Sequence, residues 1–393
     1  MFEKPKIMKK LNATLKPILR HCSIVLFAFA TMGLLATMAL NLSFLNPVAQ
    51  TMKGFSLTDI YYHVMEEYGQ RDTSRVITIV DMTELVNRAD LADVLAQIEE
   101  ANPKVIGVDI VFEGWKTDSM ADMYLSDVAH AYDNIIFSYR MLDYVNDSIG
   151  YSRELHSFFT EIAPVHEGFT NYERTLYGAM KRKSNLRRVC NGEMRNSFVQ
   201  EVAMRYTDGQ LADHKSDDLN INFRPTVFRV VSPDSIAAHR DWIEDHVVLF
   251  GATHELADMH YTPLGEIAGI ELLAYSLQTM FEETEVRYPD TWVTILLSFL
   301  IVLITYLWRR QYMTWAKSRE STWLRFFLTT TFVIGALLFI WSAILVGFGF
   351  ITFYMTGISI NLGWAMAAIP FLGGADEFFR LTTRRFFGGF VLF

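Results

Sequence analysis

The sequence predicts an α/β extracytoplasmic domain with a mixed, mainly parallel sheet, together with four transmembrane α-helices. Three observations predict this class. The 393 residues are 51% hydrophobic and 20% charged, their apolar residues gather in three blocks without charge, and the long stretch between the first two blocks alternates strand-like and helix-like patterns. This composition excludes a disordered chain and a small disulfide-stapled domain.

The first block is long enough for one transmembrane helix. Residues 22–45 contain no charged residue, and about 20 apolar residues span the core of a bilayer. A secretory signal peptide has a shorter apolar core, followed by a cleavage site of small residues. We therefore favour an uncleaved anchor over a signal peptide.

The other two blocks predict three more helices. Residues 291–308 carry tryptophan near each end, where indole rings prefer the headgroup level. Residues 326–375 are too long for one crossing and contain several glycine and polar residues. They predict helices at 326–347 and 354–375 joined by a tight hairpin. Because neither block contains an ionisable residue, transport by this chain alone is not expected.

The positions of lysine and arginine predict which side each segment occupies. Residues 1–21 contain six such residues against one acidic residue, and residues 309–325 contain five against one. Short basic segments stay in the cytoplasm. The tail, residues 376–393, alternates aromatic and basic residues and is expected at the inner membrane surface, where it contacts lipid headgroups or another protein. The acidic excess then falls in residues 46–290, outside the cytoplasm, which argues against a nucleic-acid partner.

The soluble stretch reads as alternating strands and helices. The predicted strands cover residues 74–81, 103–113, 133–141, 218–224 and 246–253, and the predicted helices cover residues 85–98, 118–131, 197–206 and 269–281. Residues 142–196 are polar with few long apolar runs, and we expect turns and an insertion there. The predicted sheet therefore has helices on its faces.

Polar residues cluster where the predicted strands end. Ligands of open α/β sheets bind at the carboxyl ends of parallel strands. Asp81 and Asp109 end or nearly end such strands, and the loop after the last strand brings His254, Asp258 and His260. These five residues could form one polar cleft for a small-molecule ligand or a divalent metal ion, or could act as acid and base. Each of the five residues could instead have a purely structural role, such as capping the next helix.

Sequence signatures of catalysis are absent. The chain contains no G-x-x-x-x-G-K-[ST], G-x-S-x-G, H-E-x-x-H or C-x-x-C, so the usual patterns for nucleotide hydrolysis, serine hydrolysis, zinc proteolysis and thiol redox chemistry are missing. We therefore expect no enzyme activity and no cofactor.

Five segments in order resemble a known family. VITIVDMTEL, PKVIGVDIVF, LNINFR, HVVLFGAT and DMHYTPLGEIAGIELLA have the order and spacing of the CHASE2 family of bacterial extracytoplasmic sensory domains, over about residues 50–285. The three predicted helices after the domain are also similar to the family's arrangement. The resemblance implies a sensory domain on the periplasmic side of a bacterial inner membrane. Family members usually continue into a cytoplasmic cyclase or kinase, whereas this chain extends about 18 residues past its last predicted span, and it has Leu273 where the family pattern has histidine.

Together these features predict a membrane-anchored sensor. It would detect a periplasmic ligand or envelope signal and relay it through its transmembrane helices to a separate partner protein. The alternative is a structural or assembly subunit of a multiprotein envelope complex that senses nothing. The expected partners are membrane lipid, other membrane or periplasmic proteins and a small-molecule ligand.

Overall fold

The computed structural model describes residues 17–34, 57–85, 87–172, 180–212, 214–255 and 258–386. The chain divides into two compact units. Asp59–Val286 form an α/β unit, which lies within the predicted domain at 46–290, and the described residues before and after it form a helical unit. Predictions for residues 1–16, 35–56 and 387–393 fall outside the described residues.

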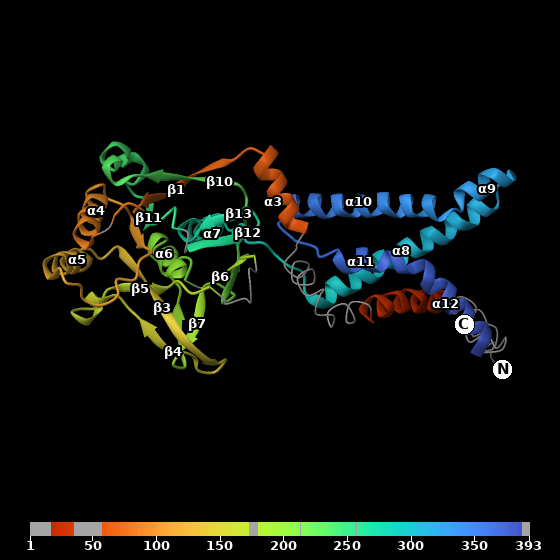
Figure 1. The fold of residues 1–393 in the computed structure, drawn as a ribbon, viewed down its shortest axis with the longest axis horizontal. Helices are drawn as coiled ribbons and strands as arrows, with labels where there is room; N and C mark the ends of the chain where they lie inside the picture. The colour runs from red at the N-terminus through yellow and green to blue at the C-terminus, as the bar shows by residue number, and fades with distance from the viewer. Residues whose placement is uncertain are drawn as a thin grey trace, which may run out of the picture. The chain divides into compact units, whose positions relative to one another are not determined.

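A nine-stranded sheet forms the centre of the α/β unit (Figure 1). Its order is β10-β1-β11-β2-β3-β4-β7-β8, and β5 pairs with β3. The strands are β1 (Asp72–Asp81), β2 (Val105–Val108), β3 (Ile135–Asn146), β4 (Gly150–Leu155), β5 (His166–Phe169), β7 (Arg187–Cys190), β8 (Glu193–Asn196), β10 (Thr226–Val231) and β11 (Val247–Gly251). The pairs among β10, β1, β11, β2, β3 and β5 are parallel, whereas β3 with β4 and β7 with β8 are antiparallel. The predicted mixed, mainly parallel sheet is confirmed.

Helices cover both faces of this sheet (Figure 1). The helices of the unit are α3 (Leu57–Tyr68), α4 (Arg88–Glu100), α5 (Ser119–Ala131), α6 (Phe198–Tyr206) and α7 (Gly269–Phe281). Neighbouring residues of a strand point to opposite faces. In β11, Val248 and Phe250 pack with α4 and α5, while Val247 and Leu249 pack with α6 and α7. The near-continuous apolar strands seen in the sequence are those of a sheet buried on both sides.

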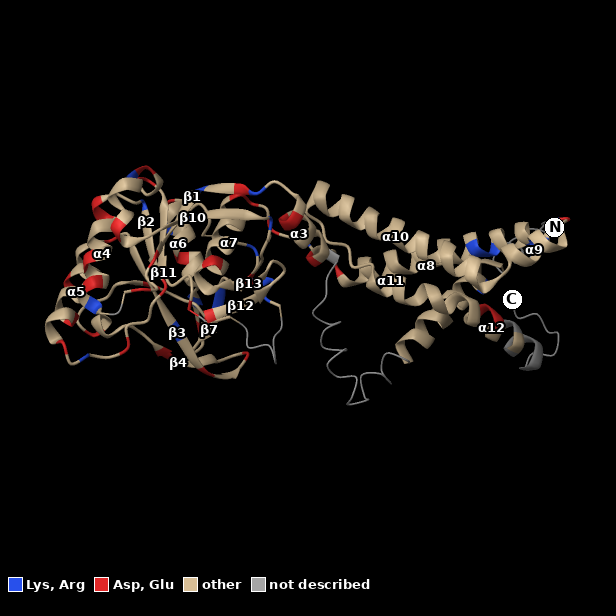
Figure 2. Ribbon diagram, turned by 45° about the horizontal axis from the view of Figure 1, so that its top comes forward, with Lys and Arg blue, Asp and Glu red and all other residues tan. Residues whose placement is uncertain are grey.

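In the described part of the unit, two short antiparallel pairs and several 3₁₀ helices accompany the sheet. They are β6 (Lys183–Asn185) with β9 (Asp218–Asn220), β12 (Met259–Thr262) with β13 (Gly265–Ala268), and η2 (Phe158–Glu161), η3 (Pro233–Ser235) and η4 (Ala237–Trp242). Acidic residues are distributed over the whole unit (Figure 2).

Four predicted helices of the α/β unit agree with α4, α5, α6 and α7 within a few residues. The predicted strand at 103–113 is shorter, because the chain leaves the sheet after Val108 and the loop that follows is held elsewhere: Phe112 N–H donates to Ser157 Oγ, 3.1 Å away. Residues 142–196 contribute strands where turns were expected. The edge strand β10 and helix α3 were not predicted.

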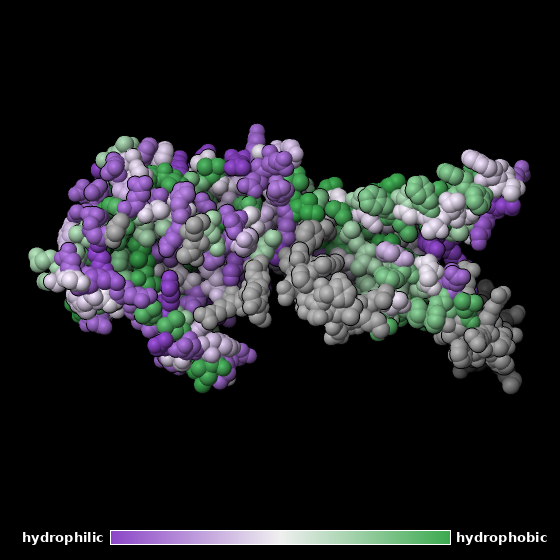
Figure 3. Space-filling view, viewed as in Figure 1, coloured by the Kyte–Doolittle hydropathy of each residue, from purple (hydrophilic) through white to green (hydrophobic). Residues whose placement is uncertain are grey.

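Three helices among the described residues are long and apolar enough to cross a membrane. They are the N-terminal helix Pro17–Leu34, α8 (Thr291–Lys317) and α10 (Thr331–Thr356). A short helix, α9 (Thr322–Leu328), precedes α10. Apolar side chains cover much of the outer surface of α8 and α10 (Figure 3), as expected for contact with lipid.

The fourth predicted span, 354–375, is corrected by the structure. The helix predicted at 326–347 instead runs to Thr356 as α10 and ends at Gly357, whose φ of 66° is left-handed. The residues that follow form α11 (Gly363–Ala368), η6 (Ile369–Phe371) and α12 (Leu372–Phe386). Pro370 lies in η6 and explains why α11 and α12 are separate helices, because proline has no N–H and its ring excludes a regular α-helical turn.

Candidate functional site

The candidate site lies at the carboxyl ends of β1, β11 and β2. The connection after β1 leads to α4 on one face, the connection after β11 leads to α7 on the other, and the connection after β2 leads back to α5 on the first. Where adjacent strands send their chains to opposite faces, a crevice opens at the sheet edge, and ligands of α/β proteins bind there. All five predicted residues lie at this edge, but their contacts divide them into two groups.

Asp81 belongs to the first group and joins two loops. Its Oδ1 accepts hydrogen bonds from Thr83 N (3.1 Å), Thr83 Oγ1 (2.6 Å) and Thr253 N (3.1 Å). Burial by itself would raise the pKa of Asp81, but these hydrogen bonds outweigh burial and lower the pKa. The carboxylate thus connects the loops after β1 and β11, a structural contribution.

His254 lies beside this first group. Its Nδ1 is 2.7 Å from Thr253 Oγ1. Burial raises the pKa of Glu271, in the first turn of α7, and His254 is close enough to oppose that shift. His254 therefore interacts with groups that are already hydrogen-bonded to the protein.

Asp109, Asp258 and His260 form the second group. His260 Nε2 is 3.5 Å from Asp258 Oδ1. The Asp258 carboxyl lies against Gly269, the first residue of α7, where a Cβ added to the glycine would be only 2.1 Å from Oδ2. Only glycine fits there, and the positive end of the α7 dipole favours a carboxylate.

Asp109 is the most perturbed member of the second group. Burial raises its pKa to about 7, and the neighbouring Asp258 contributes to that rise, while Arg140 and His260 oppose the shift. Two carboxylates in one partly enclosed place cannot both ionise easily. Perturbed carboxyl groups of this kind are concentrated at functional sites.

Sequence analysis missed two residues of this group, Arg140 on β3 and Tyr172 after β5. Both interact electrostatically with Asp109, and the Tyr172 ring centroid is 5.4 Å from that of His260. Arg140 is the one basic residue near the end of the strand predicted at 133–141, a signal that the sequence does contain. Tyr172 follows a stretch without a recognisable pattern, so nothing in the sequence marks it.

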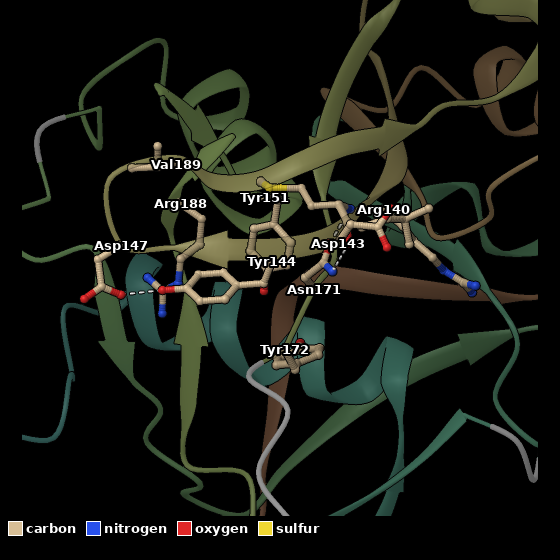
Figure 4. Close-up of a pocket in the computed structure, with 12 residues that line it drawn as sticks. Arg140, Asp143, Tyr144, Asp147, Tyr151, Asn171, Tyr172, Arg188 and Val189 are labelled. Atoms are coloured by element: carbon tan, nitrogen blue, oxygen red, sulfur yellow. Dashed lines mark hydrogen bonds between the residues drawn. The ribbon is translucent and has the colours of Figure 1, made fainter. Parts of the chain in front are cut away.

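Arg140 and Tyr172 also line a cavity of about 1010 Å³ (Figure 4). Arg140 lies at one side of that view, and Arg188 with Asp147 lies at the other. The other lining residues are Met141, Leu142, Asp143, Tyr144, Gly150, Tyr151, Asn171 and Val189. The cavity therefore runs along β3, β4 and β7, and Asp109, Asp258 and His260 are not among its lining residues.

Several polar side chains of the cavity are already used by the protein. Arg188 Nη2 donates to Asp218 Oδ1 at 2.5 Å, Tyr144 donates to Asp147, and the Asn171 amide bonds both the N–H and the carbonyl of Met141. By contrast, the side chains of Asp109 and Arg140 make no hydrogen bond with the described residues, whereas the buried Tyr172 hydroxyl interacts with the side chains of Ser184 and Ser276. Asp109 and Arg140, which interact electrostatically with each other, are therefore the two charged groups of the site that no hydrogen bond ties to the described residues.

The sequence leaves metal ligation open. Within the described ranges, no group of three or more His, Cys, Asp and Glu side chains is placed to hold a metal ion.

Asp109 makes stability depend on pH. Because its pKa of about 7 lies above the ordinary value of 3.8, the folded protein holds an additional proton between these pH values. Its contribution to stability is therefore complete near pH 4 and declines as the pH rises to about 7. Replacing Asp109 with Asn should remove this decline. Melting temperatures of the full-length protein are measured from pH 5 to 8. The melting temperature of the variant should rise relative to that of the wild type as the pH rises, and a constant difference between them would contradict a raised pKa at Asp109.

A family model of the CHASE2 domain matches residues 26–307, which include most of the N-terminal helix, the whole α/β unit and the first part of α8. No curated protein and no solved structure matches the chain.

Proposed function

Because this chain belongs to the CHASE2 domain family, a family of extracytoplasmic sensory domains, we propose that it is a sensor that detects a ligand or envelope signal in the bacterial periplasm and relays it to a separate partner protein. Three apolar helices and the family match agree with a membrane protein that has an extracytoplasmic domain. The proposed location is the inner membrane, with the basic segments in the cytoplasm.

One observation carries the ligand-binding part of this proposal. Asp109 and Arg140 bring two charged groups, without a hydrogen bond to the described residues, to the crevice where α/β proteins bind ligands, and Arg140 and Tyr172 line a cavity large enough for a small molecule. We propose binding without catalysis, since the sequence carries no signature of a nucleophile activated for reaction.

The relay is proposed to run through α8. This helix begins five residues after the end of the α/β unit, and its polar side chains contact the other helices of the bundle. Trp341 Nε1 on α10 donates to Thr305 Oγ1 at 2.9 Å, and Tyr306 donates to Asp376 on α12 at 3.0 Å. Arg310 Nη1 is 2.8 Å from His21 Nε2 on the N-terminal helix. A displacement of α8 would therefore change contacts to α10, α12 and the N-terminal helix.

The ligand-binding part can be tested without knowing the ligand. The full-length protein in nanodiscs is mixed with the small-molecule fraction of a bacterial periplasmic extract, and its melting temperature is measured. We expect the fraction to raise the melting temperature of the wild type and of Arg224→Gln, an exposed control whose guanidinium pairs with Asp72 at 2.6 Å, and to have little effect on Arg140→Gln. An equal shift in all three proteins, or no shift at all, would contradict ligand sensing at this site.

Exposed apolar side chains of the α/β unit support the alternative proposal, a structural or assembly subunit of an envelope complex. Trp115, Met120 and Met123 are 49%, 76% and 55% exposed, and exposed apolar side chains are typical of protein contacts when they are contiguous. A structural subunit would need these residues to assemble a complex and would not need Arg140. Recovery of the same membrane partners with Arg140→Gln but not with Met120→Ser, together with no ligand response, would favour that alternative.

A further inference from the structure

The outward face of α5 carries apolar side chains, although the solvent-exposed face of a helix is normally polar. Met120, Met123 and Tyr124 are all exposed, and residues three and four positions apart lie on one face of a helix. The opposite face of α5 packs in the core of the α/β unit through Leu125 and Val128. Methionine is among the residues most often buried in proteins, so two exposed methionines on one helix face indicate a contact surface.

Trp115 extends this apolar surface at the N-terminal end of α5. The backbone N–H of the next residue, Lys116, donates to Asp122 Oδ2 at 2.5 Å and holds the loop against the first turns of the helix. The Trp115 ring packs on Phe158 with 4.7 Å between the ring centroids, yet Trp115 remains 49% exposed. The α5 surface, as we call it, consists of Trp115, Met120, Met123 and Tyr124.

Acidic side chains surround the α5 surface. Asp118 caps the N-terminus of α5, and Asp127 lies in the second half of the helix. Asp93 on α4 accepts a hydrogen bond from the Tyr124 hydroxyl at 2.8 Å. All three carboxylates are exposed. Across residues 88–131, nine acidic residues stand against three basic ones (Figure 2), so the charge that complements this part of the unit is positive.

The acidic residues disfavour two other occupants of the α5 surface. A second copy of this chain would bring the same carboxylates to the contact, because both partners of a twofold interface use the same patch. An anionic lipid surface would also be repelled. A helix of another protein fits both features, since apolar residues at helical spacing would lie on the methionines while lysine or arginine beside them would face the carboxylates. Methionine suits such contacts because its flexible, polarizable side chain adapts to the partner.

We propose that the α5 surface binds a basic amphipathic helix of a second protein on the same side of the membrane as the α/β unit. Helix α5 has 13 residues and is about 20 Å long, so a partner helix of about four turns spans it. The inference applies to a sensor and to an assembly subunit alike. It is independent of the ligand cavity, because none of the four residues of the α5 surface lines that cavity.

Photo-crosslinking in the cells that produce the protein tests this inference. The photoreactive residue p-benzoylphenylalanine is placed at Met123 and, as a matched control, at Met194 on β8, which is 52% exposed. The crosslinked peptides are sequenced by mass spectrometry. We expect position 123, but not position 194, to link to a segment of another protein that is net basic and has apolar residues at helical spacing. A link to a second copy of this chain, to lipid or to an acidic segment, or no link above the control, would contradict the proposal.

The linked segment is then synthesised as a peptide and titrated by calorimetry into the full-length protein in phosphatidylcholine nanodiscs, whose neutral lipid does not attract a basic peptide. The double variant Met120→Ser with Met123→Ser should bind the peptide at least about 10-fold more weakly, because the central apolar contacts are lost. Asp127→Asn should weaken binding about 2- to 5-fold, as for one exposed ion pair, and Met194→Ser should bind like the wild type.

The double variant decides the outcome, because its two positions are exposed and should leave the melting temperature unchanged. If it binds the peptide as tightly as the wild type does, the α5 surface is not the contact and the inference is wrong. The proposed sensor is tested separately through Arg140, so it stands or falls on its own measurement.

Discussion

Replacing Arg88 with alanine is expected to lower the free energy of unfolding of the α/β unit by about 3–5 kcal/mol. Arg88 Nη1 lies 2.6 Å from Asp122 Oδ1, and the two side chains are 9% and 0% exposed. Arg88 Nη2 also donates to the carbonyl of Glu113 at 3.0 Å, and Asp122 Oδ2 accepts from the N–H of Lys116 at 2.5 Å. Removing the guanidinium leaves a buried carboxylate without its counter-charge, which costs more than the pair itself contributes.

Urea unfolding of the full-length protein in detergent micelles, followed by pulse proteolysis of the α/β unit, measures this effect. Arg224→Ala is the matched control, because its ion pair with Asp72 is exposed on both sides and such pairs contribute about 0–1 kcal/mol. If Arg88→Ala lowers the free energy of unfolding by no more than the control does, the prediction is wrong, and water would then stabilise the charge of Asp122 in the variant.

The second large effect is expected at Phe198, the first residue of α6. Its side chain is fully buried and packs where β2 and β5 carry glycine: a Cβ added to Gly107 would lie 2.6 Å from Phe198 Cζ, and one added to Gly168 would lie 2.4 Å from Phe198 Cα. The two glycines allow α6 to approach the sheet, and the ring fills the space. Phe198→Ala should cost about 3–5 kcal/mol of unfolding free energy, as for other buried aromatic truncations.

The same urea experiment tests Phe198→Ala against two comparisons. Phe198→Leu retains most of the apolar volume and should lower the free energy of unfolding by less than Phe198→Ala does. Met120→Ala, at a side chain that is 76% exposed, should change the free energy of unfolding by no more than about 0.5 kcal/mol. Equal losses for alanine and leucine would indicate that the ring itself is not what holds α6. Because β2 and β5 lead to Asp109 and Tyr172, the alanine variant is also expected to weaken ligand binding.

Local pattern was enough to predict much of the fold. Helices α4 and α7 have apolar residues at helical spacing along their length, and β11 is a continuous apolar run. The pattern of consecutive residues therefore predicts both the type of each element and its burial. The edge strand β10 is partly exposed and weakly patterned. Its pairing with β1 is a contact between residues more than 140 positions apart, which no local pattern can show.

The candidate site was predicted in part for the same reason. Asp81 and Asp109 both lie at the ends of predicted strands, and only the folded chain distinguishes them. Asp81 Oδ1 accepts hydrogen bonds from Thr83 and Thr253, whereas Asp109 interacts electrostatically with Asp258, Arg140 and His260. The sequence cannot distinguish these two carboxyl groups, because their neighbours come from loops far along the chain.

The sequence by itself determined that this chain joins apolar helices to an acidic α/β domain, since hydropathy, charge and strand–helix alternation are properties of consecutive residues, and five ordered segments carried its resemblance to the CHASE2 family. Only the tertiary structure decided that Arg140 and Tyr172 lie beside Asp109 and that α10 continues past the predicted hairpin to Gly357. The physical reason is that hydrogen-bond satisfaction, burial and the backbone conformation at one residue depend on what packs around it, and those neighbours are brought together by the fold.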